Sequence, residues 1–180
     1  MKQTRHLLIA LALGTMLTSC GASVSTATVT GPTAYVDPYI GSGGHGHVFV
    51  GASVPFGAIQ AGPQNIHKGW DWCSGYHHSD SIVIGFAHTH LSGTGCTDMG
   101  DVQIMPYTGE LRSKRGRQED IGGSCSSYYS HDNESVSPGY YSLKMDNGVR
   151  IEMTASTRTA LHRITYPEAE GRRLLINLEE

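Results

Sequence analysis

Hydrophobic and polar residues alternate along the C-terminal third of the chain. Within residues 149–156 every second residue is hydrophobic, which is the period of a strand with one buried face. Residues 146–148, just before it, read Asp-Asn-Gly, a turn sequence able to supply a positive φ. Further strands are expected at residues 140–145, 159–166 and 172–178, and the last is an apolar run typical of a buried strand. Consecutive strands with short turns predict an antiparallel meander in a β-sandwich.

The pattern changes between residues 41 and 100, where glycine, histidine and aromatic residues are dense. The chain contains 23 glycines, and here they separate short β-rich runs, expected to be strands, such as residues 82–86. A similar run follows at residues 102–105. No segment of ten or more residues after Cys20 has the periodicity of a helix. We therefore expect an all-β fold, an antiparallel β-sandwich with long glycine-rich loops, which are the usual place for a functional site.

The N-terminus has the features of an export signal. Lys2 and Arg5 precede an apolar run at residues 7–17, which is shorter than the roughly 20 residues needed to span a bilayer. Residues 17–20 read Leu-Thr-Ser-Cys and resemble a bacterial lipobox. The sequence thus predicts a signal peptide at residues 1–19, lipidation of Cys20, a Ser/Thr/Ala-rich flexible tether at residues 20–35 and one domain at residues 36–180.

This arrangement places the protein in the bacterial cell envelope, anchored to a membrane by its lipid and facing the periplasm or the exterior. The formal net charge is −3, which argues against a nucleic-acid partner because such a partner calls for a basic surface. The last predicted strand ends two residues before Glu180. We expect from this that the chain is a fragment or truncated product of a longer protein.

Three clusters of glycine, histidine and aromatic residues could carry chemistry, at residues 41–47, 69–78 and 86–96. His45 and His47, and also His88 and His90, form His-x-His pairs that could bind zinc. No carboxylate or cysteine stands at a diagnostic ligand spacing, so these histidines are expected to hydrogen-bond loop backbone or a polar ligand, and no metal site is assigned. The glycines lack the P-loop lysine, and Ser92 does not stand in a nucleophile elbow.

Trp70, Asp71 and Trp72 form a sequence suited to a sugar. An aromatic plane meets the C–H face of a sugar ring, and Asp or His side chains meet its hydroxyl groups. We expect one tryptophan to be exposed and the other to belong to the core, although their positions do not say which.

Three cysteines remain if Cys20 is lipidated, namely Cys73, Cys96 and Cys125. In an oxidising compartment one pair can form a disulfide, which leaves one odd thiol. The sequence does not say which two cysteines pair.

The same clusters resemble those of glycoside hydrolase family 92, the bacterial exo-acting α-mannosidases. The resemblance runs in order from Val36 to the C-terminus and rests on stretches at residues 36–41, 43–47, 54–57, 69–77, 85–95, 98–101, 130–134, 137–141 and 154–162.

The resemblance implies an N-terminal β-sandwich domain that packs on a larger (α/α)₆ catalytic domain, which this chain lacks. It implies a calcium-dependent, inverting enzyme that removes α-linked mannose from glycans, with its acid and base in the missing domain and no calcium ligand assigned here. The domain is expected to form one wall of the mannose pocket through Trp70, Asp71, Trp72, His88 and His90, and to be inactive alone. The alternatives are a carbohydrate-binding surface lipoprotein without activity and a zinc hydrolase built on the histidine pairs.

Overall fold

The computed structural model describes residues 30–114, 116, 124–168 and 170–178. The predicted signal peptide, Cys20 and the tether up to residue 29 lie outside these residues. Within them the helices are short 3₁₀ turns, η1 (Pro32–Tyr35), η2 (Trp70–Trp72) and η4 (His131–Asn133), and no α-helix occurs. No helix in this part of the chain has the length and apolar character needed to cross a membrane.

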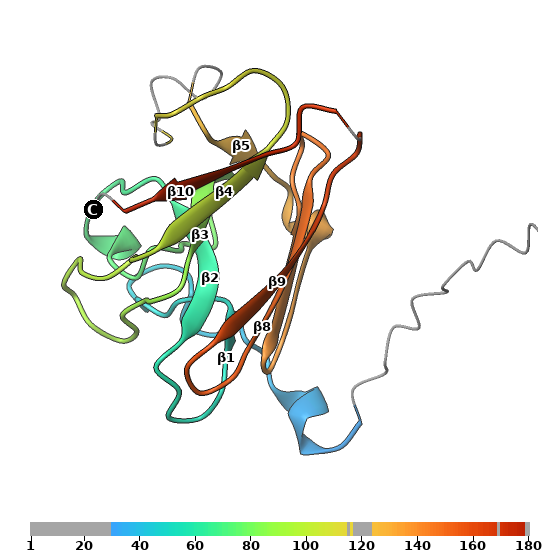
Figure 1. Ribbon diagram of the computed structural model, residues 1–180. Coiled ribbons are helices and arrows are strands. Elements are labelled where there is room, and N and C mark those ends of the chain that lie inside the picture. The colour runs from blue at the N-terminus through green and yellow to red at the C-terminus, as the bar shows by residue number, and fades with distance from the viewer. Residues whose placement is uncertain (1–29, 115, 117–123, 169, 179–180) are drawn as a thin grey trace, which may run out of the picture. The chain divides into compact units, whose positions relative to one another are not determined.

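Ten strands form two antiparallel sheets in a sandwich-like arrangement (Figure 1). The first sheet has the order β1-β2-β3-β4-β10, and β5 pairs with β3. The second sheet has the order β6-β7-β8-β9. The bounds of the strands are β1 (Ala52–Ser53), β2 (Gln60–Asn65), β3 (Ile82–Ala87), β4 (Gln103–Tyr107), β5 (Ser127–Tyr128), β6 (Glu134–Ser137), β7 (Tyr140–Lys144), β8 (Arg150–Ala155), β9 (Ala160–Thr165) and β10 (Arg173–Asn177).

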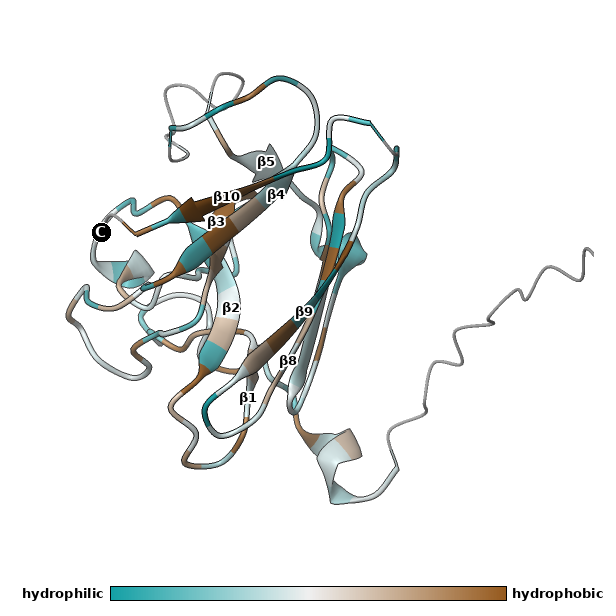
Figure 2. Ribbon diagram, in the orientation of Figure 1, coloured by the Kyte–Doolittle hydropathy of each residue, from teal (hydrophilic) through white to brown (hydrophobic). Residues whose placement is uncertain are grey.

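The hydrophobic core lies between the facing surfaces of the two sheets. Phe86 on β3 and Tyr141 on β7 are fully buried, and their ring centroids are 6.4 Å apart across the core. Ile151 and Met153 on β8 are buried as well, whereas Glu152 between them is half-buried and the flanking Arg150 and Thr154 are exposed. The alternation along β8 is therefore the one predicted, and it turns the hydrophobic face of the second sheet toward the first. Figure 2 shows the hydrophobic character of β3 and β4 on the other side of this core.

All six strands expected from the sequence are present, within two residues of the expected bounds. The predicted turn between β7 and β8 is confirmed, with Gly148 at φ 85° and Val149 N donating to Asn147 Oδ1. The meander differs from the prediction in its outer strands. It comprises β6, β7, β8 and β9, while β10 crosses to the first sheet and pairs with β4.

The strand predicted at residues 172–178 is present, but the prediction that it is buried is wrong. Leu174 is 46% exposed and Ile176 is 59% exposed, while Leu175 packs against the core. Only the face of β10 that carries Leu175 packs against the core, and a continuous apolar run does not distinguish this case from burial on both faces.

Four strands were not expected, namely β1, β2, β5 and β6. β2 contains Gly62 and Pro63, which normally disfavour a strand in the middle of a sheet. Pro63 is opposite Phe86 of β3, but the short β1 pairs only with Gln60 and Ala61. The side of Pro63 that faces away from β3 therefore has no partner strand, and the missing N–H costs no ladder hydrogen bond there.

Candidate functional site

The three glycine-rich clusters meet around Trp70, which lies on η2. The Trp70 side chain is 58% exposed, and its indole Nε1 donates to Gly95 O at 3.0 Å. The ring of His47 meets the Trp70 ring edge-on, with centroids 4.2 Å apart. Gly93 N in turn donates to His47 O at 2.7 Å. One exposed indole is thus held by both neighbouring clusters.

Asp71 joins the first two clusters through its carboxylate. His45 Nδ1 donates to Asp71 Oδ1 at 2.6 Å, and His47 Nε2 lies 3.5 Å from the same oxygen. The hydrogen bond from His45 is the largest cause that lowers the pKa of Asp71. His47 is buried, its Nε2 has no hydrogen-bond partner within the described residues, and its backbone has a positive φ of 54°. A buried, unsatisfied donor or acceptor beside an exposed indole is a group that a polar ligand can satisfy.

Trp72 takes a different position from Trp70. Its indole Nε1 donates to Asp80 Oδ2 at 2.9 Å, and its ring stacks on His77 with centroids 4.3 Å apart. Lys68 Nζ also binds Asp80 Oδ2 at 2.9 Å and lies 5.7 Å from the centroid of the Trp72 ring. The expectation of one exposed and one core tryptophan is thus half right, because Trp72 is only partly buried and lies outside the hydrophobic cluster.

Gly95 and Gly75 allow this packing. A Cβ atom at Gly95 would lie 2.8 Å from Trp70 Nε1, closer than side chains approach one another, so any larger residue displaces the indole. Gly75 has a φ of 82°, and a Cβ atom there would meet both the Gln64 amide and the His90 ring.

Both ring nitrogens of His88 and of His90 lie within hydrogen-bonding distance of other protein groups. His90 Nδ1 donates to Gln60 O at 2.8 Å, its Nε2 lies 3.0 Å from Gln64 Oε1, and burial lowers its pKa to about 4. His88 Nδ1 donates to Val102 O at 2.6 Å, and its Nε2 lies 2.9 Å from His162 Nε2 on β9. Burial, followed by the charge of His88, lowers the pKa of His162 to about 4. The sugar contacts predicted for His88 and His90 remain predictions.

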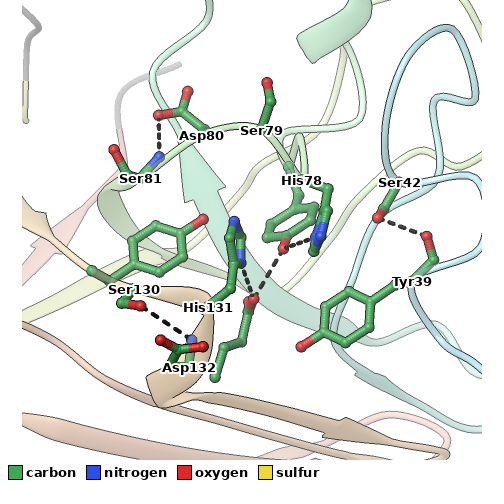
Figure 3. A network of polar contacts seen from close by, with 12 residues as sticks. Tyr39, Ser42, His78, Ser79, Asp80, Ser81, Ser130, His131 and Asp132 are labelled. Atoms are coloured by element: carbon green, nitrogen blue, oxygen red, sulfur yellow. Dashed lines mark hydrogen bonds and ion pairs between the residues drawn. The ribbon is translucent and has the colours of Figure 1, made fainter.

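A second polar centre lies beneath the Trp70 clusters, at Glu134. The side chain of Glu134 is fully buried and accepts hydrogen bonds from Tyr76 Oη at 3.0 Å, Tyr141 Oη at 2.7 Å and His131 Nδ1 at 2.7 Å. Figure 3 shows His131, His78 and Tyr39 around this centre, and the His78 and His131 rings stack with centroids 4.3 Å apart. Burial, and then the charge of Glu134, raise the pKa of Tyr76 and Tyr141 well above the ordinary value. Both tyrosines therefore stay protonated and act as donors.

The sequence does not single out Glu134 or Asp80 as a site residue. Both lie in or beside the stretches that carry the resemblance. The burial of Glu134 depends on Tyr76 and Tyr141 from other segments, which no local sequence pattern shows. Within the described residues, no group of three or more His, Cys, Asp or Glu side chains is placed to hold a metal ion. Cys73, Cys96 and Cys125 are free thiols in the structure.

The comparisons with known proteins agree on one family. Residues 35–180 match the model of the glycosyl hydrolase family 92 N-terminal domain. A family GH92 α-mannosidase from Bacteroides thetaiotaomicron, solved in complex with mannoimidazole, is 42% identical with a TM-score of 0.77, and the match covers 81% of this chain and 19% of that chain. A family GH92 inverting mannosidase from the same species is 26% identical with a TM-score of 0.64, covering 82% of this chain and 20% of that chain.

An uncharacterized secreted glycosidase from Arthroderma benhamiae is 32% identical over 142 residues, which is 74% of this chain and 17% of that protein. The fold and the clustered aromatic and polar loops are those of a β-sandwich domain from a glycosidase. The chain belongs to glycoside hydrolase family 92 and corresponds to its N-terminal domain. It spans about a fifth of the length of the solved relatives it matches.

Replacing Glu134 by glutamine is expected to lower the free energy of unfolding by on the order of 3 kcal/mol, because a hydrogen bond to a charged group contributes about 1.5–3 kcal/mol and three donors converge on this carboxylate. Urea unfolding of the two proteins at pH 7 measures the difference. Glu110→Gln, at an exposed loop residue, is the matched control and should be near neutral. Equal stability of Glu134→Gln and the parent would contradict a structural role for the network.

The stability of the domain is expected to fall as the pH decreases from about 6.5 to about 4, because His90 and His162 remain neutral in the folded protein while the unfolded chain takes up protons. The contribution of each histidine is complete above its ordinary pKa and is lost below it. The variant His162→Gln should therefore show a smaller fall in unfolding free energy between pH 7 and pH 4.5 than the parent. His67→Gln, at an exposed histidine, is the control. Identical pH dependence in His162→Gln and the parent would rule this out.

Proposed function

We propose that this chain is the N-terminal domain of a calcium-dependent, inverting exo-α-mannosidase, and that Trp70 and Asp71 form one wall of its mannose pocket. The observation that carries the proposal is the exposed Trp70 indole, held from both sides by backbone and ring contacts and bordered by Asp71, His45 and His47. A fixed aromatic plane beside hydroxyl-binding groups is what a sugar ring requires. Family membership supports α-linked mannose as that sugar.

The exposure of Trp70 also supports a second wall of the sugar pocket that comes from outside this domain. A sugar pocket that excludes water needs walls on more than one side, and the 58% exposed indole presents one open face. The catalytic domain that we propose for the longer protein would supply the other wall. His47 would then offer its unpartnered Nε2 to a sugar hydroxyl group.

The carboxylates of this domain have structural partners, which supports an acid and a base located outside it. Inverting hydrolysis needs two carboxyl groups about 6.5–9.5 Å apart with a water molecule beside one of them. Glu134 and Asp80 are buried and fully engaged, Asp71 is bound by His45, and Asp101 Oδ2 accepts from Thr89 at 2.9 Å. None of these four acids is free to exchange a proton with a substrate without losing a contact that orders a loop.

Calcium belongs to the proposal for the whole enzyme, and no calcium ligand is assigned to a residue of this domain. The zinc hydrolase alternative has no supporting cluster among the described residues.

We further propose that Cys20 carries a lipid anchor and that the enzyme faces the periplasm or the exterior of a bacterial cell. The support is the short apolar run followed by Leu-Thr-Ser-Cys at residues 17–20. The matched Arthroderma benhamiae protein is described as a secreted glycosidase.

Expression with labelled palmitate in a bacterial host tests the anchor. The parent and the control Cys125→Ser are expected to carry the label, and Cys20→Ser is expected to lose it because no other residue in residues 1–29 bears a thiol. Label retained by Cys20→Ser would refute lipidation at this site.

In the full-length protein, Trp70→Ala is expected to lower kcat/KM on α-linked mannobiose by on the order of 100-fold, because loss of the wall misplaces the glycosidic oxygen. Trp72→Ala should instead mainly cost stability, on the order of 3 kcal/mol, since its indole binds Asp80 and stacks on His77. Initial rates with and without a calcium chelator, together with melting curves, measure both effects.

Trp70→Phe serves as the matched variant, because it keeps an aromatic plane and loses only the hydrogen bond to Gly95 O. It should retain more activity than Trp70→Ala. Normal rates in Trp70→Ala would overturn the role of this wall, and activity unaffected by chelator would overturn calcium dependence. Mannose release by the isolated domain would overturn the placement of the acid and base. Binding of mannoside by a full-length protein that shows no hydrolysis would favour the carbohydrate-binding lipoprotein.

A further inference from the structure

Cys73 and the segment containing Cys96 lie against each other, although 22 residues separate them in the sequence. Cys73 follows η2 directly, and its thiol donates to Thr94 O at 3.0 Å. One residue later, Gly95 O accepts the indole hydrogen bond of Trp70. The segment Thr94-Gly95-Cys96 is thus held against η2 at two successive carbonyl groups. Cys96 therefore stands two residues after Thr94, whose carbonyl oxygen contacts Cys73 Sγ.

The environments of the two thiols differ in a way that suits stepwise oxidation. Cys73 is buried, and Cys96 is exposed. Burial is the largest cause that raises the pKa of the Cys73 thiol, and the charge of Cys96 also raises it. An external disulfide can reach Cys96 and cannot reach Cys73 without displacing the loop.

Cys125 is in a separate environment. Its side chain is buried, and its sulfur atom lies 3.6 Å from Arg112 O. Burial is the largest cause that raises the pKa of the Cys125 thiol, and the charge of Arg112 and a hydrogen bond with Tyr107 lower it. None of these groups belongs to η2 or to the loop after β3, so Cys125 is the odd thiol of the three.

We propose that Cys73 and Cys96 form a disulfide that ties η2 to the loop after β3 when the protein meets a disulfide oxidant, and that the structure is the dithiol form of this pair. The thiolate of Cys96 attacks one sulfur atom of the oxidant and releases one thiol. The Cys73 thiol then loses its proton and attacks Cys96 Sγ, which releases the second thiol. The two cysteines give up two electrons and two protons, and the oxidant becomes two thiols.

Disulfide formation replaces a weak hydrogen bond of the Cys73 thiol with a covalent bond. The thiol of Cys73 is a weak donor, so loss of its hydrogen bond to Thr94 O costs little. The new bond would hold the Trp70 turn against Gly95 in the same arrangement that the indole hydrogen bond already favours. This inference does not depend on the carbohydrate substrate, because it concerns only the two thiols and their loops.

The test uses the full chain with Cys20→Ser and Cys125→Ser, so that Cys73 and Cys96 are the remaining thiols. The reduced protein is incubated with oxidised glutathione, blocked with N-ethylmaleimide under denaturing conditions and digested. Trypsin leaves both cysteines in one peptide, residues 69–112, since no Lys or Arg lies between them. Cleavage before aspartate separates them, because Asp80 lies between the two.

The tryptic peptide is expected to carry no N-ethylmaleimide and to be lighter by two hydrogen atoms than the reduced peptide. The two fragments from cleavage before aspartate should stay joined until a reductant is added. Amide exchange at residues 93–96 should slow in the oxidised protein. The control Cys96→Ala should leave Cys73 fully modified by N-ethylmaleimide after denaturation.

Modification of both cysteines after oxidation would overturn the proposal, as would a stable glutathione adduct on Cys96. A disulfide between Cys125 and either cysteine in the otherwise unaltered chain would also overturn it. Circular dichroism before digestion confirms that the chain is folded, and Cys73→Ala reports whether Cys96 reacts alone. None of these outcomes alters the expected effect of Trp70→Ala on hydrolysis, so failure of this proposal and failure of the proposed function are separately visible.

Discussion

The buried carboxylate of Glu134 is the point on which the arrangement of the loops depends. A charged group removed from water is costly unless donors surround it, and here the donors come from three parts of the chain. Tyr76 belongs to the cluster that carries Trp70, Tyr141 belongs to β7, and His131 belongs to η4. Satisfying one charge therefore fixes the end of the 69–78 cluster against the second sheet. No single pair of residues could do this, since the cost of the buried charge is offset only when the donors are present together.

Asp80 performs the corresponding role toward the first sheet. Its Oδ1 accepts from the backbone N–H groups of Ser81 and Ile82, where β3 begins, and its Oδ2 accepts from Trp72 and Lys68. Asp80 thus ties the two ends of the segment between η2 and β3, and Glu134 holds Tyr76 within it. This explains the unequal roles of the two tryptophans. Trp72 faces Asp80 and is drawn inward, while Trp70, two residues earlier on a tight turn, stays exposed and donates its indole N–H to the Gly95 carbonyl.

Much of the sheet structure was predictable from the sequence, because a strand with one buried face repeats every two residues and β8 shows that period without interruption. The turn at Gly148 was predictable for a similar reason, since only a few residues readily supply a positive φ. The pairing of β10 with β4 was not predictable, because pairing is a long-range choice that leaves no local pattern. β2 was missed because Gly62 and Pro63 read as a loop, and their place in a sheet depends on the shortness of β1.

The candidate site was predictable in location and not in detail. Glycine, histidine and tryptophan in three clusters indicated where a ligand could bind, and the contacts of Trp70 with His47 and Gly95 bring those clusters together. The side chains that are free to bind a ligand could not be predicted, because this depends on which of them already form hydrogen bonds within the folded domain. His88 and His90 are engaged by Val102, His162, Gln60 and Gln64, whereas His47 Nε2 lies 3.5 Å from Asp71 Oδ1 and forms no hydrogen bond within the described part of the chain.

The hydrogen-bond partners of its acids limit what such a domain can contribute to catalysis. Its acids order loops, and moving a proton to or from Glu134 or Asp80 would remove the interaction that holds the Trp70 cluster in place. A group cannot readily both maintain the geometry of a site and change its charge during turnover. In the function proposed above, the domain would provide shape and orientation, through an indole plane that stays in position while charge develops elsewhere. A protein that divides the work in this way can keep its proton-transfer groups in one domain and the rigid wall that positions the sugar in another.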